Sequence, residues 1–229
     1  MGGMDPSLIA AFKTVFVVVA ALLPILNPPG PAPVFLAMTQ GASPAVRAVL
    51  ARRIAFNVFF MLVAAMFVGS FVLEFFGISL PVVRVAGGLL VCSTAWHLLT
   101  AADPQDTGDA AISANSVSFD VLSQRAFYPL TFPLTCGPGS IAVAITLGAS
   151  LQSSKVAVLN MASALVGLTL LSATVFVFLR FAERILRPLG KTGTTVFLRL
   201  MAFVLLCIGV EILWDGLSAL LEPWKAVRR

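Results

Sequence analysis

Long apolar runs separated by short polar segments dominate the chain. The runs are too long for barrel strands, and backbone polar groups inside a bilayer must be satisfied within the segment itself, so the pattern predicts an all-α membrane protein. We expect six transmembrane helices, with these bounds: helix 1 in two halves at 12–26 and 32–39, helix 2 at 54–76, helix 3 at 81–100, helix 4 at 126–151, helix 5 at 156–181 and helix 6 at 195–221.

The polar segments divide the six helices into two groups of three. Residues 41–53 and 77–80 are expected to connect the first three helices, and a basic connection that includes Lys191 is expected before helix 6. The long hydrophilic stretch lies between helices 3 and 4 and carries several aspartates. We therefore divide the chain into a first three-helix repeat at 1–101, an acidic loop at 102–125 and a second three-helix repeat at 126–229.

Two proline-rich segments interrupt helices 1 and 4 near the middle of their apolar runs. Residues 22–34 read LLPILNPPGPAPV, and residues 129–143 read PLTFPLTCGPGSIAV. An offset of 109 places Pro29 on Pro138 and Gly30 on Gly139. Because proline has no backbone N–H and clashes with the preceding turn, neither run is expected to be a continuous helix.

Further matches indicate that the two halves are repeats. An offset of 115 places Arg84 on Arg199, and an offset of 103 places Asn57 on Asn160. A repeat with three crossings ends on the opposite side of the membrane from where it began, so the second copy is expected to be inverted relative to the first.

Composition and charge agree with a membrane setting. Apolar residues make up 59% of the chain and charged residues 11%, far fewer than in soluble domains. The net charge of +5 comes from basic residues at the ends of apolar runs, where they anchor helices, so nucleic-acid binding is not expected. Cys92, Cys136 and Cys207 show neither disulfide nor metal spacing and are expected in the core. The distribution of basic residues, nine against six, favours both termini outside the cytoplasm.

The two interruptions are the candidate binding site. A half-helix that starts inside the membrane directs backbone amides and positive partial charge toward a ligand anion, and we expect such starts near Pro31 and Ser140. Prolines also free carbonyls that accept hydrogen bonds from an ammonium group. A small zwitterion suits both features. The alternatives are simple helix kinks and re-entrant hairpins. The predicted site residues are Asn27, Pro28, Pro29, Gly30, Cys136, Gly137, Pro138, Gly139 and Ser140.

Polar residues within the other spans are second-rank candidates, because such residues in a bilayer are often functional. We assign gating or charge coupling to Arg84, Arg199, Glu211, Asn57 and Asn160. Each has a structural alternative: the arginines could extend to the interface, and the asparagines could link helices by hydrogen bonds. Asp215 shares a helix face with Glu211, and His97 is expected at the interface.

The paired signatures NPPGPAPVF and PLTFPLTCGPGSI, together with RVAGGLLV and RLMAFVLL in the third helix of each half, resemble the MarC family. The resemblance extends over residues 12–221. It implies a six-span inner-membrane protein related in topology to LysE-type exporters, and some members are described as transporters of glycine and alanine. Asn27 and Pro28 stand where similar proteins often carry an acidic residue, which weighs against cation or proton coupling at this position.

The hypothesis is therefore a secondary transporter that moves a small neutral amino acid by alternating access between the two repeats. No nucleotide-binding loop is present in the sequence, so a gradient is expected to drive transport. We expect no enzymatic activity, cofactor or metal. The expected partners are the solute, membrane lipid and, optionally, a second copy of the chain. The alternative is a translocase for a phosphorylated lipid carrier, and an intramembrane enzyme or a structural membrane protein is less favoured.

Overall fold

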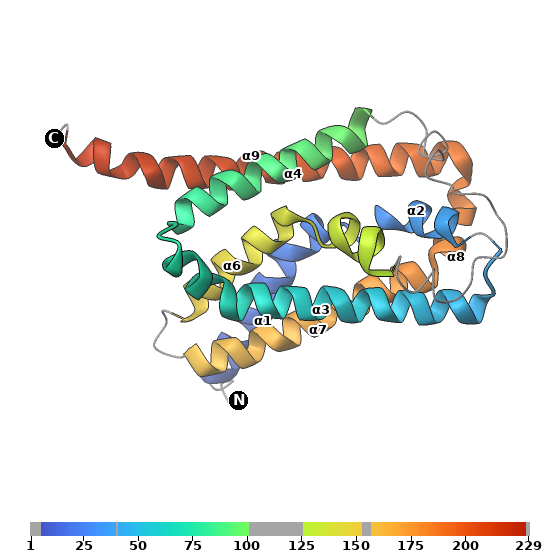
Figure 1. Ribbon diagram of the computed structural model, residues 1–229, viewed down its shortest axis with the longest axis horizontal. Helices are drawn as coiled ribbons and strands as arrows, with labels where there is room; N and C mark the ends of the chain where they lie inside the picture. The colour runs from blue at the N-terminus through green and yellow to red at the C-terminus, as the bar shows by residue number, and fades with distance from the viewer. Residues whose placement is uncertain (1–5, 40, 101–125, 153–156, 228–229) are drawn as a thin grey trace, which may run out of the picture.

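The computed structural model describes residues 6–39, 41–100, 126–152 and 157–227, and all regular secondary structure within them is helical (Figure 1). The predicted helical class is confirmed. The elements are α1 (Pro6–Leu26), α2 (Pro31–Met38), α3 (Pro44–Phe75), α4 (Leu80–Thr100), η2 (Ala126–Thr135), α6 (Pro138–Gln152), α7 (Ala157–Arg180), α8 (Ala182–Leu186), η3 (Arg187–Leu189) and α9 (Gly190–Val227).

Among the described residues, five helices are long and apolar enough to cross a membrane. They are α1, α3, α4, α7 and α9. A sixth span is present if η2 and α6, which meet at a bend of 68°, are counted as one crossing. The expected acidic loop at 102–125 lies outside the described residues.

Several helix bounds differ from the prediction. Helix 2 begins at Pro44 because the Ser43 side chain accepts a hydrogen bond from the Val46 amide at 3.3 Å, and Pro44 suits the first turn. Residues 44–53 are therefore helical, and α3, with 32 residues, is about 48 Å long at the usual helical rise. The last helix, α9, is also longer than expected at both ends. The short elements α8 and η3 occupy much of the expected basic connection.

The first interruption follows a longer helix than predicted. Because residues 6–11 continue the helix, α1 has 21 residues and is by itself long enough to span, whereas α2 has only eight. The prediction of two halves at 12–26 and 32–39 was therefore wrong about the start of the first piece, whereas the second agrees with α2 within one residue.

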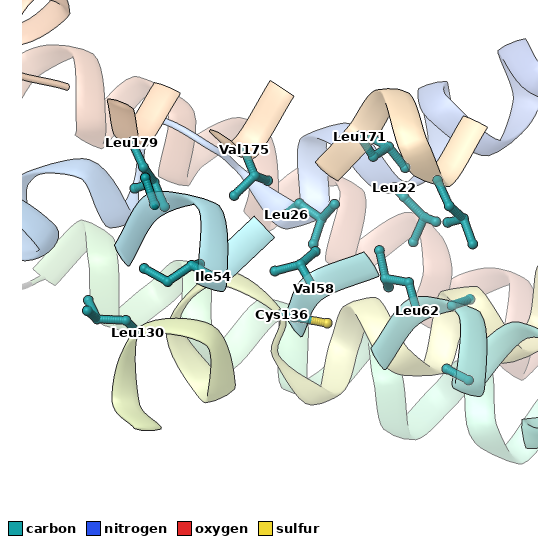
Figure 2. Packing of buried hydrophobic residues seen from close by; sticks show 14 of the residues in the cluster. Leu22, Leu26, Ile54, Val58, Leu62, Leu130, Cys136, Leu171, Val175 and Leu179 are labelled. Atoms are coloured by element: carbon teal, nitrogen blue, oxygen red, sulfur yellow. The ribbon is translucent and has the colours of Figure 1, made fainter. Parts of the chain in front are cut away.

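The long helices α3, α4, α7 and α9 lie roughly along the long axis of the molecule (Figure 1). The start of α1 and the end of α9 lie toward the left of this view, and the end of α4 lies toward the right. One large buried cluster joins residues from α1, α3, η2, α6 and α7, and Figure 2 shows part of it. A smaller cluster lies between α4 and α9 around Val91, Ala95 and Leu205.

Glycines allow the helices of the large cluster to approach closely. A Cβ atom at Gly148 of α6 would overlap the Met66 carbonyl of α3. At Gly167 of α7, a Cβ would lie 3.0 Å from the Val18 side chain of α1. Small residues at helix crossings are typical of membrane proteins, where close packing replaces the hydrophobic effect between helices.

The contact between α4 and α9 is also built on glycine. A Cβ at Gly88 would lie 2.6 Å from the Leu213 amide nitrogen, and one at Gly209 would lie 2.9 Å from the Cys92 amide nitrogen. Gly216 similarly meets Val85 at 2.8 Å. The residue numbers rise along α4 as they fall along α9, so the two helices form an antiparallel pair in backbone contact.

Candidate functional site

The first interruption comprises residues 27–30. Asn27 adopts a positive φ of 43°, a conformation that asparagine tolerates better than most residues. Its amide donates to the Leu23 carbonyl at 3.0 Å, and its own carbonyl accepts from the Gly30 amide at 2.8 Å. A Cβ at Gly30 would lie 2.7 Å from Asn27 Nδ2, so the Asn27 side chain lies directly over Gly30. This turn separates α1 from α2.

The end of α1 presents hydrogen-bond acceptors. Pro28 and Pro29 have no N–H with which to reach the carbonyls of Pro24 and Ile25 four residues earlier. The Gly30 amide bonds to Asn27 and leaves the Leu26 carbonyl without its usual partner. The negative end of the helix dipole adds to the effect of these three carbonyls.

The start of α2 provides few donors. Its first and third residues, Pro31 and Pro33, have no amide hydrogen, and the Ala32 amide donates to the Pro29 carbonyl at 3.2 Å. The expectation that the half-helix start at Pro31 offers free amides was therefore wrong. The first interruption is suited to binding a cation.

The second interruption lies between η2 and α6. The segment η2 is an irregular helix with extended dihedral angles at Tyr128 and Phe132 and a cis peptide bond before Pro133. The Cys136 amide donates to the Thr131 carbonyl at 2.8 Å. The next helix begins at Pro138, two positions before the predicted start at Ser140.

The start of α6 presents hydrogen-bond donors. The Ile141 amide is the first in this helix to find a partner, the Gly137 carbonyl at 3.2 Å. The amides of Gly139 and Ser140 belong to the first turn, where no intrahelical acceptor exists. Ser140 Oγ donates to the Gly137 carbonyl at 2.8 Å and lies 3.5 Å from Cys136 Sγ. The second interruption is therefore suited to an anionic group.

The two interruptions border the same buried cluster. Helix α1 runs into the centre of the molecule and α6 runs out of it, and the two helices pack against each other (Figure 1). Leu26, at the end of α1, and Cys136 belong to the same core cluster, and Figure 2 shows both beside Val58 of α3. The acceptor end of α1 and the donor end of α6 thus share one region of the core.

The predicted site residues differ in burial. Pro138 is exposed, and the half-buried members are Asn27, Pro29, Gly30 and Gly137. The buried members are Pro28, Cys136, Gly139 and Ser140. A Cβ at Gly139 would overlap the Val91 side chain, so this glycine also brings α6 against α4.

Two buried threonines beside the second interruption were not predicted. The hydroxyl of Thr131 donates to the Ala126 carbonyl and that of Thr135 to the Leu130 carbonyl, each at 2.6 Å. Each threonine follows a proline by two residues in the motif PLTFPLT, and this spacing could have identified them. Thr131 Oγ also accepts from Asn57 Nδ2 at 3.3 Å.

Of the predicted coupling residues, Asn57 bonds to Thr131 beside the second interruption, but the charged ones do not lie at either interruption. Arg84 lines a groove of about 200 Å³ between α4, α6 and α9, together with Asp215 and Thr146. Arg199 and Glu211 are exposed on α9. No residue of either interruption lines the Arg84 groove.

The two asparagines link pairs of helices. Asn57 of α3 contacts Thr131 of η2, and Asn160 of α7 accepts from Thr14 Oγ of α1 at 3.1 Å. Among the cysteines, Cys136 is buried and Cys92 half-buried, but Cys207 is exposed, so the expectation of a core position for Cys207 was wrong.

Comparison with known proteins gives a single family. The family described as MarC family integral membrane protein matches residues 12–221. The UPF0056 inner membrane protein MarC of Escherichia coli strain UTI89 is 32% identical over 220 residues, which covers 93% of this chain and 98% of the relative. The protein of the same name from strain K12 is 31% identical with the same coverage. No solved structure matches the chain.

Proposed function

The chain belongs to the MarC family of integral membrane proteins, and we propose that it is a secondary transporter for a small neutral amino acid. Its relatives are named inner membrane proteins, and we place this chain in the same membrane with both termini outside the cytoplasm. Transport proceeds by alternating access between two inverted three-helix repeats, one at 1–101 and the other at 126–229.

The observation that carries the proposal is the opposite chemistry of the two interruptions. Three carbonyls without helical partners lie at the end of α1, and two free amides lie at the start of α6. Each helix end adds a partial charge of about half a unit, negative at α1 and positive at α6. An α-amino acid carries an ammonium and a carboxylate on adjacent carbons, and it can satisfy both helix ends at once.

The buried surroundings favour a small solute. Neither interruption contains a charged side chain, so binding depends on backbone groups and on the net neutrality of the zwitterion. The Asn27 side chain lies over Gly30, and Val91 lies over Gly139, so little space is left for a large substituent. Glycine and alanine fit this description best.

Three contacts support the inverted repeats. The second helix of the first repeat, α3, is hydrogen-bonded through Asn57 to the first helical segment of the second repeat. The second helix of the second repeat, α7, is hydrogen-bonded through Asn160 to the first helix of the first repeat. The third helices, α4 and α9, pair with each other. Each repeat thus completes the other, as a twofold axis in the membrane plane requires.

The test is uptake and counterflow of labelled glycine and alanine in liposomes that contain the purified protein. Gly139→Val should abolish flux because its side chain collides with Val91 and displaces the start of α6 from α4. Ser140→Ala should raise KM about fivefold, because the loss of one hydrogen bond costs about 1 kcal/mol of binding free energy. Ser163→Ala is the matched control, since Ser163 Oγ also donates to a backbone carbonyl at 2.8 Å but lies on α7.

Absence of flux with both amino acids would overturn the proposed substrate class, and equal KM values for the two serine variants would overturn the proposed site. Binding of a polyprenyl phosphate in place of an amino acid would instead support a lipid-carrier translocase.

A further inference from the structure

A groove of about 300 Å³ runs between α3 and α7 on the surface of the large cluster. Its walls are mainly aromatic and apolar, with Phe56 and Phe59 from α3 and Phe176 from α7. Three polar residues, Arg52, Thr169 and Ser172, also line it. The groove shares no residue with the two interruptions and is a separate feature of the molecule.

One end of the groove is basic. The helices α3 and α7 are antiparallel (Figure 1). Arg52, toward the start of α3, therefore lines the groove at the same end as Phe176, toward the end of α7. Arg180, the last residue of α7, follows Phe176 by one helical turn on the same side of the helix. The Arg52 guanidinium lies 5.9 Å from the centre of the Phe56 ring, which holds it against the groove.

The basic end coincides with the end of a membrane span, because the span of α7 finishes at Arg180. Arginines at this level are positioned to meet lipid headgroups. The other end of the groove, at Phe59 and Thr169, is deeper in the span. The groove therefore runs from headgroup depth toward hydrocarbon.

Ser172 supplies a polar group in the apolar part of the groove. Its side chain is 7% exposed, and its Oγ atom has no hydrogen-bond partner among the described residues. A buried hydroxyl without a partner is unfavourable unless a bound molecule satisfies it. Ser172 lies about 6 Å deeper than Phe176 along α7, at four residues of helical rise.

We propose that the α3–α7 groove binds an anionic phospholipid of the surrounding bilayer. The phosphate pairs with Arg52, an ester oxygen one turn deeper accepts from the Ser172 hydroxyl, and one acyl chain lies against Phe56 and Phe59. The order of charge, ester and hydrocarbon in the lipid matches the order of groups along the groove. Attraction between arginine and anionic headgroups gives the preference for an anionic lipid.

The experiment titrates the detergent-solubilised protein with phosphatidylglycerol or phosphatidylcholine of identical acyl chains, and native mass spectrometry counts the bound lipids. We expect phosphatidylglycerol to bind more tightly, and Arg52→Gln to weaken its binding about fivefold, as loss of one headgroup arginine implies. Arg187→Gln is the matched control, because Arg187 is exposed on η3 and lies outside the groove.

A second pair of variants tests the deeper contact. Ser172→Ala should weaken both lipids by a similar factor, since both carry the ester. Ser163→Ala should leave both unchanged because its hydroxyl is already bonded within α7. Equal affinity for the two lipids, or equal loss in Arg52→Gln and Arg187→Gln, would overturn the proposal. Unchanged binding in Ser172→Ala would do the same.

Discussion

Replacement of Gly88 by valine should separate α4 from α9. A Cβ atom at this position would lie 2.6 Å from the Leu213 amide nitrogen and 2.8 Å from its Cα. Ordinary contact begins at 3.4 Å, so the shorter distance falls 0.8 Å below it. The obstructing atoms are backbone atoms and cannot rotate away. The helices must move apart, and the contacts at Gly209 and Gly216 would open with them.

The cost follows from how extensively this pair packs. Helices α4 and α9 form the most extensive helix contact among the described elements, so a separation weakens many contacts at once. Overpacking at a rigid site typically costs about 1–3 kcal/mol, and for a domain of this size that corresponds to a fall in Tm of roughly 2–12 °C. Thermal unfolding of the detergent-solubilised protein measures this shift.

The matched control is Ala86→Val, which adds atoms to the same helix at an exposed position. Its Tm should remain within about 2 °C of the parent, the usual range for surface substitutions. If Gly88→Val melts at the same temperature as Ala86→Val, the close backbone contact between α4 and α9 does not exist in the protein.

Three further predictions concern polar contacts and burial. Asn57→Ala should destabilise the folded protein by about 0.6 kcal/mol, the typical contribution of a hydrogen bond between membrane helices. Asn160→Ala should destabilise it by at least as much, because Asn160 makes a further interaction besides its bond to Thr14. Unfolding in mixed detergent measures both free energies. Arg47→Gln should lower the Tm more than Glu183→Gln, because Arg47 pairs with Glu183 at 3.1 Å and also donates to the carbonyl of Thr39, which directly follows α2. Cys136 is fully buried and should react with a membrane-permeant maleimide more slowly than the exposed Cys207, as mass spectrometry of the labelled chain would show.

The positions of the two interruptions could be predicted because their cause is local. Proline lacks an amide hydrogen wherever the chain goes, so breaks near the end of α1 and the start of α6 were expected. The exact end of α1 did not follow from residue type, because Pro24 lies inside this helix. The same reasoning failed at Pro31, since donors there depend on whether the single remaining amide finds a partner within the turn.

The membrane class and most span bounds were likewise readable from the chain, because hydropathy and helix length are properties of consecutive residues. The start of helix 2 at Pro44 was missed because the Ser43 cap begins the helix with a polar turn, and the apolar pattern does not include this turn.

Only the tertiary structure shows which residues contact one another. Arg84 and Arg199 occupy matching positions in the two halves, yet one lines a groove and the other is exposed, since the helices that pack against them differ. The contact between Asn57 and Thr131 joins residues 74 positions apart. Local pattern can place a polar residue within a span, but only the packing of distant helices determines which group it meets.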